Sequence, residues 1–421
     1  MITDYIRRSI EPILQKSGRT FKSVLVTGPR QVGKTTTLVE TFKGVPRTTF
    51  DDKIQLRNAL SDPALFLRDN PPPAILDEVQ YAPAIFPEIK RVLDDGREYG
   101  RYFLTGSQQY NLMENVTESL SGRIAVHELQ GLSMREIKGV EFNRHFVPTE
   151  EYLSKRKMSL VRYDDIWQHI HRGSNPELQS PEIEWSTYWS SYVQTYMERD
   201  VSQMINVKDK MAFITFMTAV AARTGQLLNY SAVAEEVGKT VATIKEWISV
   251  LQASGLVFLL QPYSSSALTR AIKTPKIYFR DTGLACYLTR WLTPETIRAS
   301  AMNGNIFETF VVSEILKSFS NSGQDYRFSV FYYRGKDKRK MRKNGVTESY
   351  ESEIDLIIHE NGVLYPIEIK MSANPDTSMA NAFDVLDLDQ TKIRGKGAII
   401  CLYDKLVNLK EDLLAVPIEY I

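Results

Sequence analysis

Hydrophobic residues in the first third of the chain occur in short runs, separated by amphipathic stretches. Between about residues 20 and 130, each run ends in glycine or in acidic residues, and helix-like spacing follows it. Short apolar strands that alternate with helices are typical of a parallel sheet covered on both faces. The pattern therefore predicts an α/β unit. The runs are SVLVTG at 23–28, PAILDEV at 73–79 and RYFLTGS at 101–107.

The middle of the chain has helical periodicity instead. Residues 223–263 predict a short helix, a turn at Gly238, a second helix that stops at Gly255, and a strand. Ser231 and Thr240 are natural N-caps for these two helices. This succession is typical of a winged helix. Upstream of it, an aromatic stripe at helical spacing is predicted to pack in a core. The stripe comprises Trp185, Tyr188, Trp189, Tyr192 and Tyr196.

The last part of the chain, from residue 300, returns to strands and helices. A helix is expected at NIFETFVVSEILKSF, and strands are expected near 327–333, 354–358 and 363–370. A further helix near 378–388 and a strand at GAIICLY complete the pattern. The pattern predicts a second, separate α/β unit.

Composition narrows the class of protein. The chain has 421 residues, of which 43% are hydrophobic, so about two to four domains are expected. Its 52 basic and 51 acidic residues nearly balance, so any surface for nucleic acid must be local. The two cysteines, Cys286 and Cys401, exclude a disulfide scaffold and suit a reducing compartment. Without an apolar signal core or a run of 18 apolar residues, we expect a cytoplasmic protein that does not span a membrane.

A glycine-rich motif follows the first apolar run. In VLVTGPRQVGKTTT, Gly28 and Gly33 enclose four residues, and the motif GxxxxGK[ST] lies between a strand and a helix. Backbone amides of such a loop hold phosphate oxygens. We expect Lys34 to contact the β- and γ-phosphates and Thr35 to bind Mg²⁺. With Thr36 next in the chain, these residues predict a site for ATP and Mg²⁺.

The second apolar run ends in Asp77 and Glu78. Asp77 is expected to hold Mg²⁺ through water, and Glu78 is expected to orient or deprotonate the attacking water. A capped strand end would explain one acid but not two after a buried strand downstream of a phosphate-binding loop. Lys34, Asp77 and Glu78 therefore form the predicted catalytic set for ATP hydrolysis.

Other residues are candidates for sensing the γ-phosphate. Ser107 or Gln108 follows the strand in FLTGSQQ. Arg123 in SLSGRIAV is a candidate arginine finger or sensor, and Arg199 in MERDV is its alternative. A solvated or structurally paired arginine is the competing interpretation for both.

These motifs together resemble a known family. The resemblance rests on GPRQVGKTT, ILDEVQ, FLTGSQ, TYMERDV, KTPKIYFRDTGLA and the final EIDLII with PIEIK, in that order and over nearly the whole chain. The chain is similar to prokaryotic AAA-superfamily ATPases whose C-terminal domain has no assigned function. The resemblance implies an ATPase module, a winged helix and a C-terminal fold similar to PD-(D/E)xK nucleases.

The fold class expected from pattern and resemblance is therefore multidomain α/β, with a parallel-sheet P-loop NTPase core and a restriction-endonuclease-like C-terminal domain. We expect a P-loop ATPase core at residues 1–145, a helical lid or connector at 146–205, a winged helix at 206–295 and the nuclease-like domain at 296–421.

Charged residues interrupt two apolar strands in SEIDLIIHENGVLYPIEIK, residues 352–370. Because side chains of a strand alternate between faces, Asp355 lies opposite its apolar neighbours, and Glu368 shares a face with Lys370. Two adjacent strands can therefore bring Asp355, Glu368 and Lys370 to one patch. This patch resembles the D…ExK constellation of the nuclease superfamily.

An upstream helix offers a further acid for this patch. Glu308 shares a helical face with Val311, Val312 and Ile315, so we expect it to point inward, and Glu314 is the competing choice. In such a site carboxylates bind one or two Mg²⁺ ions, here through Asp355 and Glu368, and the lysine orients water or offsets charge in the transition state. The alternatives are an inactive fold that keeps the pattern, or a strand-edge salt bridge between Glu368 and Lys370.

Two kinds of macromolecular partner are compatible with the sequence. The basic run KDKRKMRK at 336–343 can neutralise DNA phosphates, or it is a solvated hairpin tip. The second helix of the winged helix offers Lys239 and Lys245 but also Glu246, which suits protein docking as well as DNA. Because an arginine finger often comes from a neighbouring subunit, a homo-oligomer is also expected.

Two functions follow from this sequence. One is an ATP-driven, Mg²⁺-dependent enzyme that handles DNA. The alternative is a nucleotide-dependent switch or assembly protein whose C-terminal domain binds a protein partner without cleaving DNA.

Overall fold

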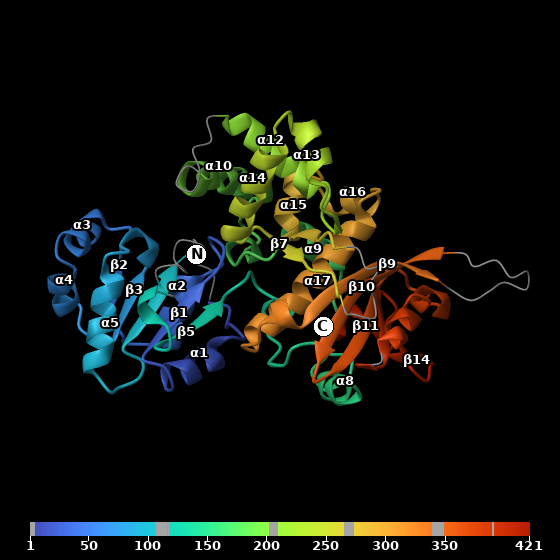
Figure 1. The fold of residues 1–421 in the computed structure, drawn as a ribbon, viewed down its shortest axis with the longest axis horizontal. Coiled ribbons are helices and arrows are strands. Elements are labelled where there is room, and N and C mark those ends of the chain that lie inside the picture. The colour runs from blue at the N-terminus through green and yellow to red at the C-terminus, as the bar shows by residue number, and fades with distance from the viewer. Residues whose placement is uncertain are drawn as a thin grey trace, which may run out of the picture.

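The computed structural model describes residues 5–106, 116, 118–201, 209–264, 273–338, 349–389 and 391–421, and gives the backbone alone for residues 199, 200, 336–338 and 349–351. Figure 1 shows an N-terminal lobe (residues 5–128), a mainly helical middle lobe (residues 166–298) and a C-terminal lobe (residues 303–421). The connecting segment 129–165 runs beside the C-terminal lobe, where α8 lies.

The N-terminal lobe is built on a parallel sheet with the strand order β2-β3-β4-β1-β5. Every residue of β1, β3 and β4 is buried, as expected for central strands of a sheet covered on both faces. The strands are β1 (Ser23–Thr27), β2 (Arg47–Thr49), β3 (Ala74–Asp77), β4 (Tyr102–Gly106) and β5 (Ile124–Glu128). This arrangement confirms the parallel α/β core predicted from the apolar runs.

Helices cover both faces of this sheet. Separate hydrophobic clusters lie on its two sides, one that includes Leu25 and Leu104 and one that includes Val24 and Phe103. Consecutive residues of a strand face opposite sides, which explains why neighbours in β1 and β4 belong to different clusters. The helices are α1 (Glu11–Gly18), α2 (Lys34–Thr41), α3 (Lys53–Ser61), α4 (Pro63–Asp69) and α5 (Ile85–Asp95), with a 3₁₀ turn η1 (Val79–Tyr81).

The connecting segment and the start of the middle lobe are helical. The predicted aromatic stripe lies on α10, where Trp185, Trp189, Tyr192 and Tyr196 are buried in the core as expected. Tyr188 is half-buried and serves a contact described below. The helices are α7 (Met134–Ile137), α8 (Glu150–Lys157), α9 (Ile166–Arg172), η2 (Glu177–Gln179), α10 (Trp185–Tyr196) and the π-helical η3 (Met197–Val201).

The rest of the middle lobe combines helices with a small antiparallel sheet in the order β6-β8-β7. Thr240 caps α14 as predicted, by accepting a hydrogen bond from the Thr243 amide (3.1 Å). The predicted cap at Ser231 is wrong, because Asn229 accepts from the Ala232 amide (3.0 Å) and α13 begins one residue before Ser231. The elements are α12 (Lys210–Ala221), β6 (Gln226–Leu227), α13 (Tyr230–Val237), α14 (Val241–Ala253), β7 (Val257–Leu260), β8 (Lys276–Phe279), α15 (Thr282–Leu288) and α16 (Pro294–Arg298).

The C-terminal lobe holds a mixed sheet in the order β14-β15-β13-β11-β10-β9, with β12 beside β11. Strands β9, β10 and β11 are antiparallel, whereas β11, β13 and β15 are parallel. The elements are α17 (Asn303–Asn321), η4 (Tyr326–Phe328), β9 (Val330–Lys338), β10 (Ser349–Glu360), β11 (Val363–Ile369), η5 (Thr377–Ala380), η6 (Phe383–Leu388), β12 (Ile393–Arg394), β13 (Gly397–Cys401), β14 (Val407–Lys410), β15 (Leu413–Pro417) and η7 (Ile418–Tyr420).

The helix predicted near 378–388 is wrong in type. The chain there forms the 3₁₀ segments η5 and η6. Asp and Asn occur repeatedly in this stretch, and their short polar side chains favour local turns over a continuous α-helix.

The middle and C-terminal lobes share a hydrophobic core that also takes in the connecting segment. This cluster runs from Met134 and Phe146 through Trp189 and Trp247 to the C-terminal Ile421. Residues around Met134, which were predicted as part of the ATPase core, therefore pack with the C-terminal body of the protein. In the described ranges no helix is long and apolar enough to cross a membrane.

Candidate functional site

The phosphate-binding loop joins β1 to α2 and has the backbone that its glycines were predicted to allow. Gly28 has φ 143° and Gly33 has φ 89°, both in the region that favours glycine. A Cβ added to Gly28 would lie 2.0 Å from the backbone oxygen of Leu129, so the close approach to the end of β5 excludes any side chain. Lys34 follows as the first residue of α2.

Lys34 is buried within this loop. Its Nζ donates hydrogen bonds to the backbone oxygens of Gly28 (3.1 Å) and Pro29 (2.7 Å). The ammonium group thus lies among the backbone groups that would surround a triphosphate.

The next residue, Thr35, meets the acid at the end of β3. Its Oγ1 donates to Asp77 Oδ1 (2.5 Å), and Thr105 Oγ1 donates to the same oxygen (2.6 Å). Thr105 Oγ1 in turn accepts from the Glu78 amide (3.0 Å). A hydroxyl and a carboxylate in contact are oxygen ligands that suit Mg²⁺, so this pair fits the predicted ion. Sequence reasoning missed Thr105, although it lies at the end of β4, two residues before Ser107.

Glu78 has an unusual backbone conformation. Its φ of 60° is left-handed, which is uncommon for a residue with a side chain and is often found at functional sites. Its Oε2 accepts a hydrogen bond from Gln80 Nε2 (2.5 Å), a partner that sequence reasoning did not single out. The structure thus brings Lys34, Thr35, Asp77 and Glu78 to one edge of the sheet.

The other residues predicted for the nucleotide site are exposed, outside the described residues, or distant from the phosphate-binding loop. Thr36 is exposed on the first turn of α2. Ser107 and Gln108 lie outside the described residues, as does the side chain of Arg199, so their roles remain predictions. Arg123 immediately precedes β5, and because β5 runs parallel to β1, it lies at the opposite end of the sheet from the phosphate-binding loop.

The sensor role predicted for Arg123 within its own chain therefore does not fit the structure. Its guanidinium instead forms a bidentate pair with Asp94, with Nε to Oδ1 at 2.6 Å and Nη2 to Oδ2 at 3.1 Å. Hydrogen bonding in this pair raises the pKa of Arg123 and lowers the pKa of Asp94. This is the structurally paired arginine that was the competing interpretation.

A second candidate site lies in the C-terminal lobe, where charged side chains of β10 and β11 meet. The register pairs Leu356 with Ile367, so Asp355 and Glu368 are cross-strand neighbours. Lys370 Nζ lies 2.5 Å from Glu368 Oε1 and 3.6 Å from Asp355 Oδ2. The predicted convergence of these three residues is present, and we call them, with Glu308, the acidic site.

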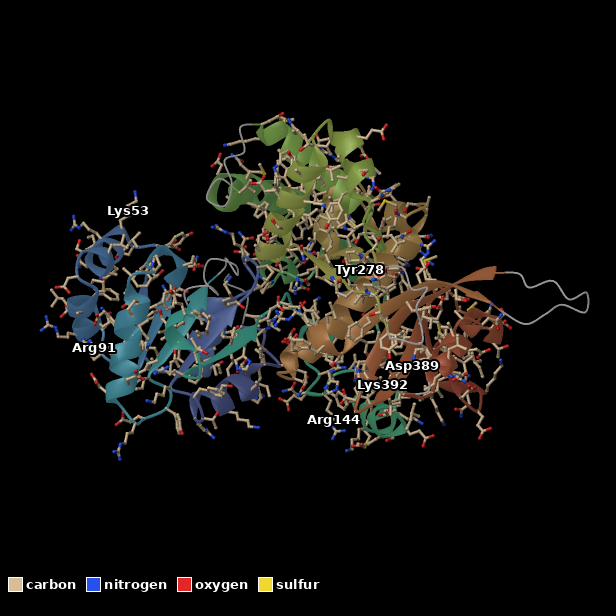
Figure 2. All side chains as sticks on the ribbon, viewed as in Figure 1. Lys53, Arg91, Arg144, Tyr278, Asp389 and Lys392 are labelled. Carbon is tan, nitrogen blue, oxygen red and sulfur yellow. The ribbon has the colours of Figure 1, made fainter. Side chains whose placement is uncertain are left out.

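Helix α17 contributes Glu308 to the acidic site. Glu308 Oε1 accepts a hydrogen bond from Tyr278 Oη (2.6 Å), and Figure 2 shows Tyr278 where the middle lobe meets the C-terminal lobe. Glu314, the competing choice, instead pairs with Lys317 (2.8 Å) and accepts from the Met134 amide (2.8 Å). It therefore lies in the contact with the connecting segment.

Lys276 also reaches the acidic site, and sequence reasoning missed it. This first residue of β8 enters from the middle lobe, and its side chain is 3% exposed. Its Nζ lies 2.7 Å from Glu353 Oε1, 3.2 Å from Glu308 Oε1 and 3.8 Å from Asp355 Oδ1. The sequence feature that could have revealed Lys276 is a lysine at the start of an otherwise apolar strand. A charged residue in an apolar strand is also the pattern that singled out Glu368.

Burial and crowding of acids dominate the electrostatics of the acidic site. Burial, followed by the charge of Asp355, raises the pKa of Glu308, and Lys276 opposes the shift. Burial and Asp355 also raise the pKa of Glu368, against the pull of Lys370. In the described part of the chain, no group of three or more His, Cys, Asp or Glu side chains is arranged to hold a metal ion. With two ammonium groups among these carboxylates, the acidic site as arranged does not fit the predicted Mg²⁺.

Contacts from the middle lobe surround the phosphate-binding loop. A Cβ added to Gly255, which lies between α14 and β7, would come within 2.8 Å of Pro29 Cγ, so the Gly255 backbone packs against the Pro29 ring. Tyr188 Oη donates to Gln31 Oε1 (2.7 Å). From within the N-terminal lobe, the buried Arg8 also donates to the Val32 backbone oxygen (2.8 Å).

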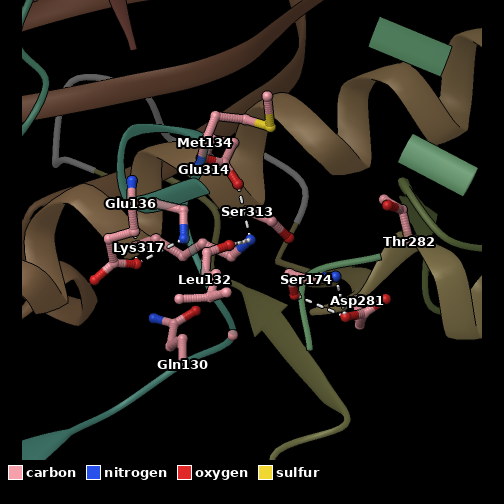
Figure 3. Close-up of polar contacts among 12 residues, drawn as sticks. Gln130, Leu132, Met134, Glu136, Ser174, Asp281, Thr282, Ser313, Glu314 and Lys317 are labelled. Atoms are coloured by element: carbon pink, nitrogen blue, oxygen red, sulfur yellow. Dashed lines mark hydrogen bonds and ion pairs between the residues drawn. The ribbon is translucent and has the colours of Figure 1, made fainter. Parts of the chain in front are cut away.

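The end of β5 is also tied to the other lobes. Arg280, directly after β8, pairs with Glu128 (Nη1 to Oε1, 2.9 Å) and donates to Tyr326 Oη (2.7 Å). Figure 3 shows the neighbouring contacts. There, Lys317 Nζ on α17 donates to the Leu132 backbone oxygen (3.0 Å), and Asp281 accepts from the Ser174 hydroxyl (2.7 Å). The chain that leaves the parallel sheet of the N-terminal lobe is therefore attached to α17 by these hydrogen bonds.

Comparisons with known proteins agree with the first of these sites. Residues 20–138 match the model of an AAA domain. Residues 163–295 and 303–421 match models of domains of unknown function, DUF8612 and DUF4143. The phosphate-binding loop and the AAA match together support a P-loop ATPase domain at residues 20–138, for which ATP is the expected nucleotide and Mg²⁺ its usual companion.

Two relatives align with nearly the whole of this chain. Uncharacterized proteins of Mycobacterium bovis and Mycobacterium tuberculosis are each 25% identical over 417 residues, which is 99% of this chain and 84% of theirs. Among solved structures, a Walker-type ATPase of Pyrococcus abyssi aligns with a TM-score of 0.41 and 12% identity, over 68% of this chain and 97% of that one. A signal-transduction ATPase of Pyrococcus horikoshii with a tetratricopeptide repeat sensor aligns with a TM-score of 0.24 and 9% identity, over 76% of this chain and 48% of that one.

Proposed function

We propose that this protein is a nucleotide-dependent switch in which ATP binding and hydrolysis in the N-terminal lobe control the C-terminal acidic site. The observation that carries the proposal is the packing of the phosphate-binding loop against the middle lobe, whose strand β8 also supplies Lys276 to the acidic site. A change at the loop therefore has a short mechanical route to the acidic site.

The residues of the N-terminal lobe have distinct proposed roles in hydrolysis. Lys34 neutralises charge on the β- and γ-phosphates, and Glu78 orients or deprotonates the attacking water. Thr35 and Asp77 would hold Mg²⁺, which when bound supplies positive charge at the phosphate oxygens. Thr105 and Gln80 orient the two acids through the hydrogen bonds that they donate to them.

Transmission to the C-terminal lobe is proposed to follow the contacts of the loop. Phosphates that enter the loop compete with the Gly28 and Pro29 carbonyls for Lys34 and shift the Pro29 ring against Gly255. Gly255 leads directly into β7, and β7 pairs with β8 along its length. The pair of Arg280 with Glu128 anchors the other end of β8 to the ATPase sheet.

ATP hydrolysis by the Lys34→Ala variant tests the nucleotide site. We expect at least a 100-fold lower rate than in the wild type, because the charge on the phosphates is no longer neutralised. Lys43→Ala is the matched control, since Lys43 follows α2 on the surface with a side chain that is 78% exposed, and it should hydrolyse ATP normally. Hydrolysis by Lys34→Ala at the wild-type rate would contradict the assignment.

A second function, ATP-regulated and Mg²⁺-dependent cleavage of DNA by a PD-(D/E)xK-like C-terminal lobe, is favoured by the meeting of Asp355, Glu368 and Lys370. Nicking of supercoiled plasmid, with and without ATP, separates the two functions. Nicking that Asp355→Asn and Lys370→Ala abolish supports the nuclease. Absence of nicking in a wild-type protein that hydrolyses ATP supports the switch. The basic run 336–343, the proposed DNA contact, lies outside the described side chains.

The proposed partners follow from the same two functions. For the switch, the surface of α13 and α14, which we propose to be a winged helix, would dock a protein. A homo-oligomer that supplies an arginine in trans remains a proposal. Light scattering with and without ATP tests it, and a monomer in both conditions would contradict it.

A further inference from the structure

The acidic site brings a lysine of one lobe among the carboxylates of another. Glu308 comes from α17 and Glu353 and Asp355 come from β10, whereas Lys276 comes from β8 of the middle lobe. The Lys276 ammonium lies within 4.0 Å of all three carboxylates and 5.6 Å from the centre of the Tyr332 ring. These carboxylates and the ring face favour a cation at this position, although Arg334 and Lys370 also pair with Glu353 and Asp355.

The carboxylates also retain capacity for a further ligand. Glu368 is 7% exposed, and its Oε2 has no hydrogen-bond partner among the described residues, although Oε1 of the same carboxylate pairs with Lys370. A buried carboxylate oxygen without a partner is costly and indicates a position where a positive group or a donor can bind.

We propose that Lys276 is a built-in cation that closes the acidic site to divalent metal ions, and that nucleotide at the phosphate-binding loop sets whether it stays there. The inference deepens the proposed switch by naming what the switch controls. An ammonium donates hydrogen bonds to the same carboxylate oxygens that a divalent ion would take as ligands, so the two cannot occupy the site together.

The position of Lys276 on β8 explains how nucleotide binding at the phosphate-binding loop would affect this residue. Lys276 and Arg280 lie at the two ends of β8, and Arg280 is held by Glu128 at the end of β5. β8 pairs with β7, which begins just after the Gly255 contact with Pro29. A displacement of the loop therefore moves the strand that places the lysine.

Binding of Mn²⁺ to the full chain, without nucleotide, tests whether Lys276 excludes divalent ions from the acidic site. Electron paramagnetic resonance counts bound Mn²⁺ in the wild type, in Lys276→Met and in each protein with Asp355→Asn added. We expect Lys276→Met to gain an Asp355-dependent Mn²⁺ that binds at least tenfold more tightly than any in the wild type. Equal Asp355-dependent binding in both proteins would overturn the proposal.

A matched control separates this effect from the loss of any buried lysine. Lys317 also forms a buried pair, with Glu314, at a similar exposure of 4%, but it lies outside the acidic site. Lys317→Met should gain no Asp355-dependent Mn²⁺, and a gain equal to that of Lys276→Met would overturn the proposal. Should Lys276→Met fail to fold, Lys276→Gln keeps an N–H donor and serves in its place. Because these measurements use no nucleotide, a failure of ATP hydrolysis leaves their outcome unaffected.

Chemical labelling of the wild type tests whether nucleotide regulates the position of Lys276. Reductive methylation followed by peptide mass mapping should leave Lys276 at least tenfold less modified than the exposed Lys157 in nucleotide-free protein. Addition of a non-hydrolysable ATP analogue should raise the labelling of Lys276 severalfold. Labelling of Lys276 that does not change with the analogue would overturn the proposal that nucleotide regulates Lys276. Fast labelling of Lys276 without the analogue would overturn the proposal that Lys276 closes the acidic site.

Discussion

Substitution of Gly255 by alanine probes the contact between the phosphate-binding loop and the middle lobe. Gly255 has φ 73°, and the added Cβ would lie 2.8 Å from Pro29 Cγ. Carbon atoms in contact prefer about 3.5 to 4.0 Å, so the ring or the turn must retreat by at least about 0.7 Å. The left-handed backbone adds about 1–2 kcal/mol of strain for an alanine.

Gly238→Ala is the matched control for this substitution. Gly238 ends α13 in the same lobe with φ 67°, and an added Cβ there would meet nothing within 4 Å. Both variants therefore carry the backbone strain, but the displacement of Pro29 belongs to Gly255→Ala alone. Thermal unfolding should show a lower melting temperature for both.

Steady-state ATP hydrolysis distinguishes the two variants. Because a displacement of about 1 Å in groups that position a substrate can lower a rate about 100-fold, we expect kcat/KM of Gly255→Ala to fall about 10- to 100-fold. Gly238→Ala should hydrolyse ATP like the wild type. Equal kcat/KM for the two variants would refute the reasoning that the loop and the middle lobe are coupled through this contact.

Four further substitutions test other parts of the structure. Arg280→Met removes the half-buried ion pair with Glu128 and the hydrogen bond to Tyr326, and should lower the free energy of unfolding by about 1.5–3 kcal/mol, measured by thermal unfolding. Asn229→Ala should lower it by about 1 kcal/mol by removing the cap of α13, whereas Ser231→Ala should change it little. Burial and Asp355 raise the pKa of Glu368 to about 8, so the folded chain holds this proton more tightly than the unfolded chain and loses stability as pH rises through that value. In Glu368→Gln, the fall in melting temperature between about pH 6 and pH 9 should therefore be smaller than in the wild type.

The local parts of both sites could be predicted from the sequence because short-range geometry determines them. The spacing of Gly28, Gly33 and Lys34 requires a strand before the motif and a helix after it, and the structure has both. The alternation of side chains along a strand was enough to place Asp355 and Glu368 together, once their strands were known to be adjacent.

Contacts between distant segments could not be predicted in the same way. Lys276 reaches the acidic site because β8 packs beside α17 in a shared core, and no periodicity in the sequence specifies that packing. Arg123 is the reverse case, because the sequence suggested a role at the nucleotide site. The residue precedes β5 at the end of the sheet away from the phosphate-binding loop. Asn229 was missed because two residues suited to capping lie close together, and only the backbone decides between them.

Hydrogen–deuterium exchange tests the central claim most directly. The claim is that nucleotide at the phosphate-binding loop changes the structure around the acidic site. The comparison is the wild type with and without a non-hydrolysable ATP analogue, beside Lys34→Ala under the same conditions. The switch predicts altered exchange in β8 and α17 of the wild type and none in Lys34→Ala. A change confined to the N-terminal lobe of the wild type would contradict it.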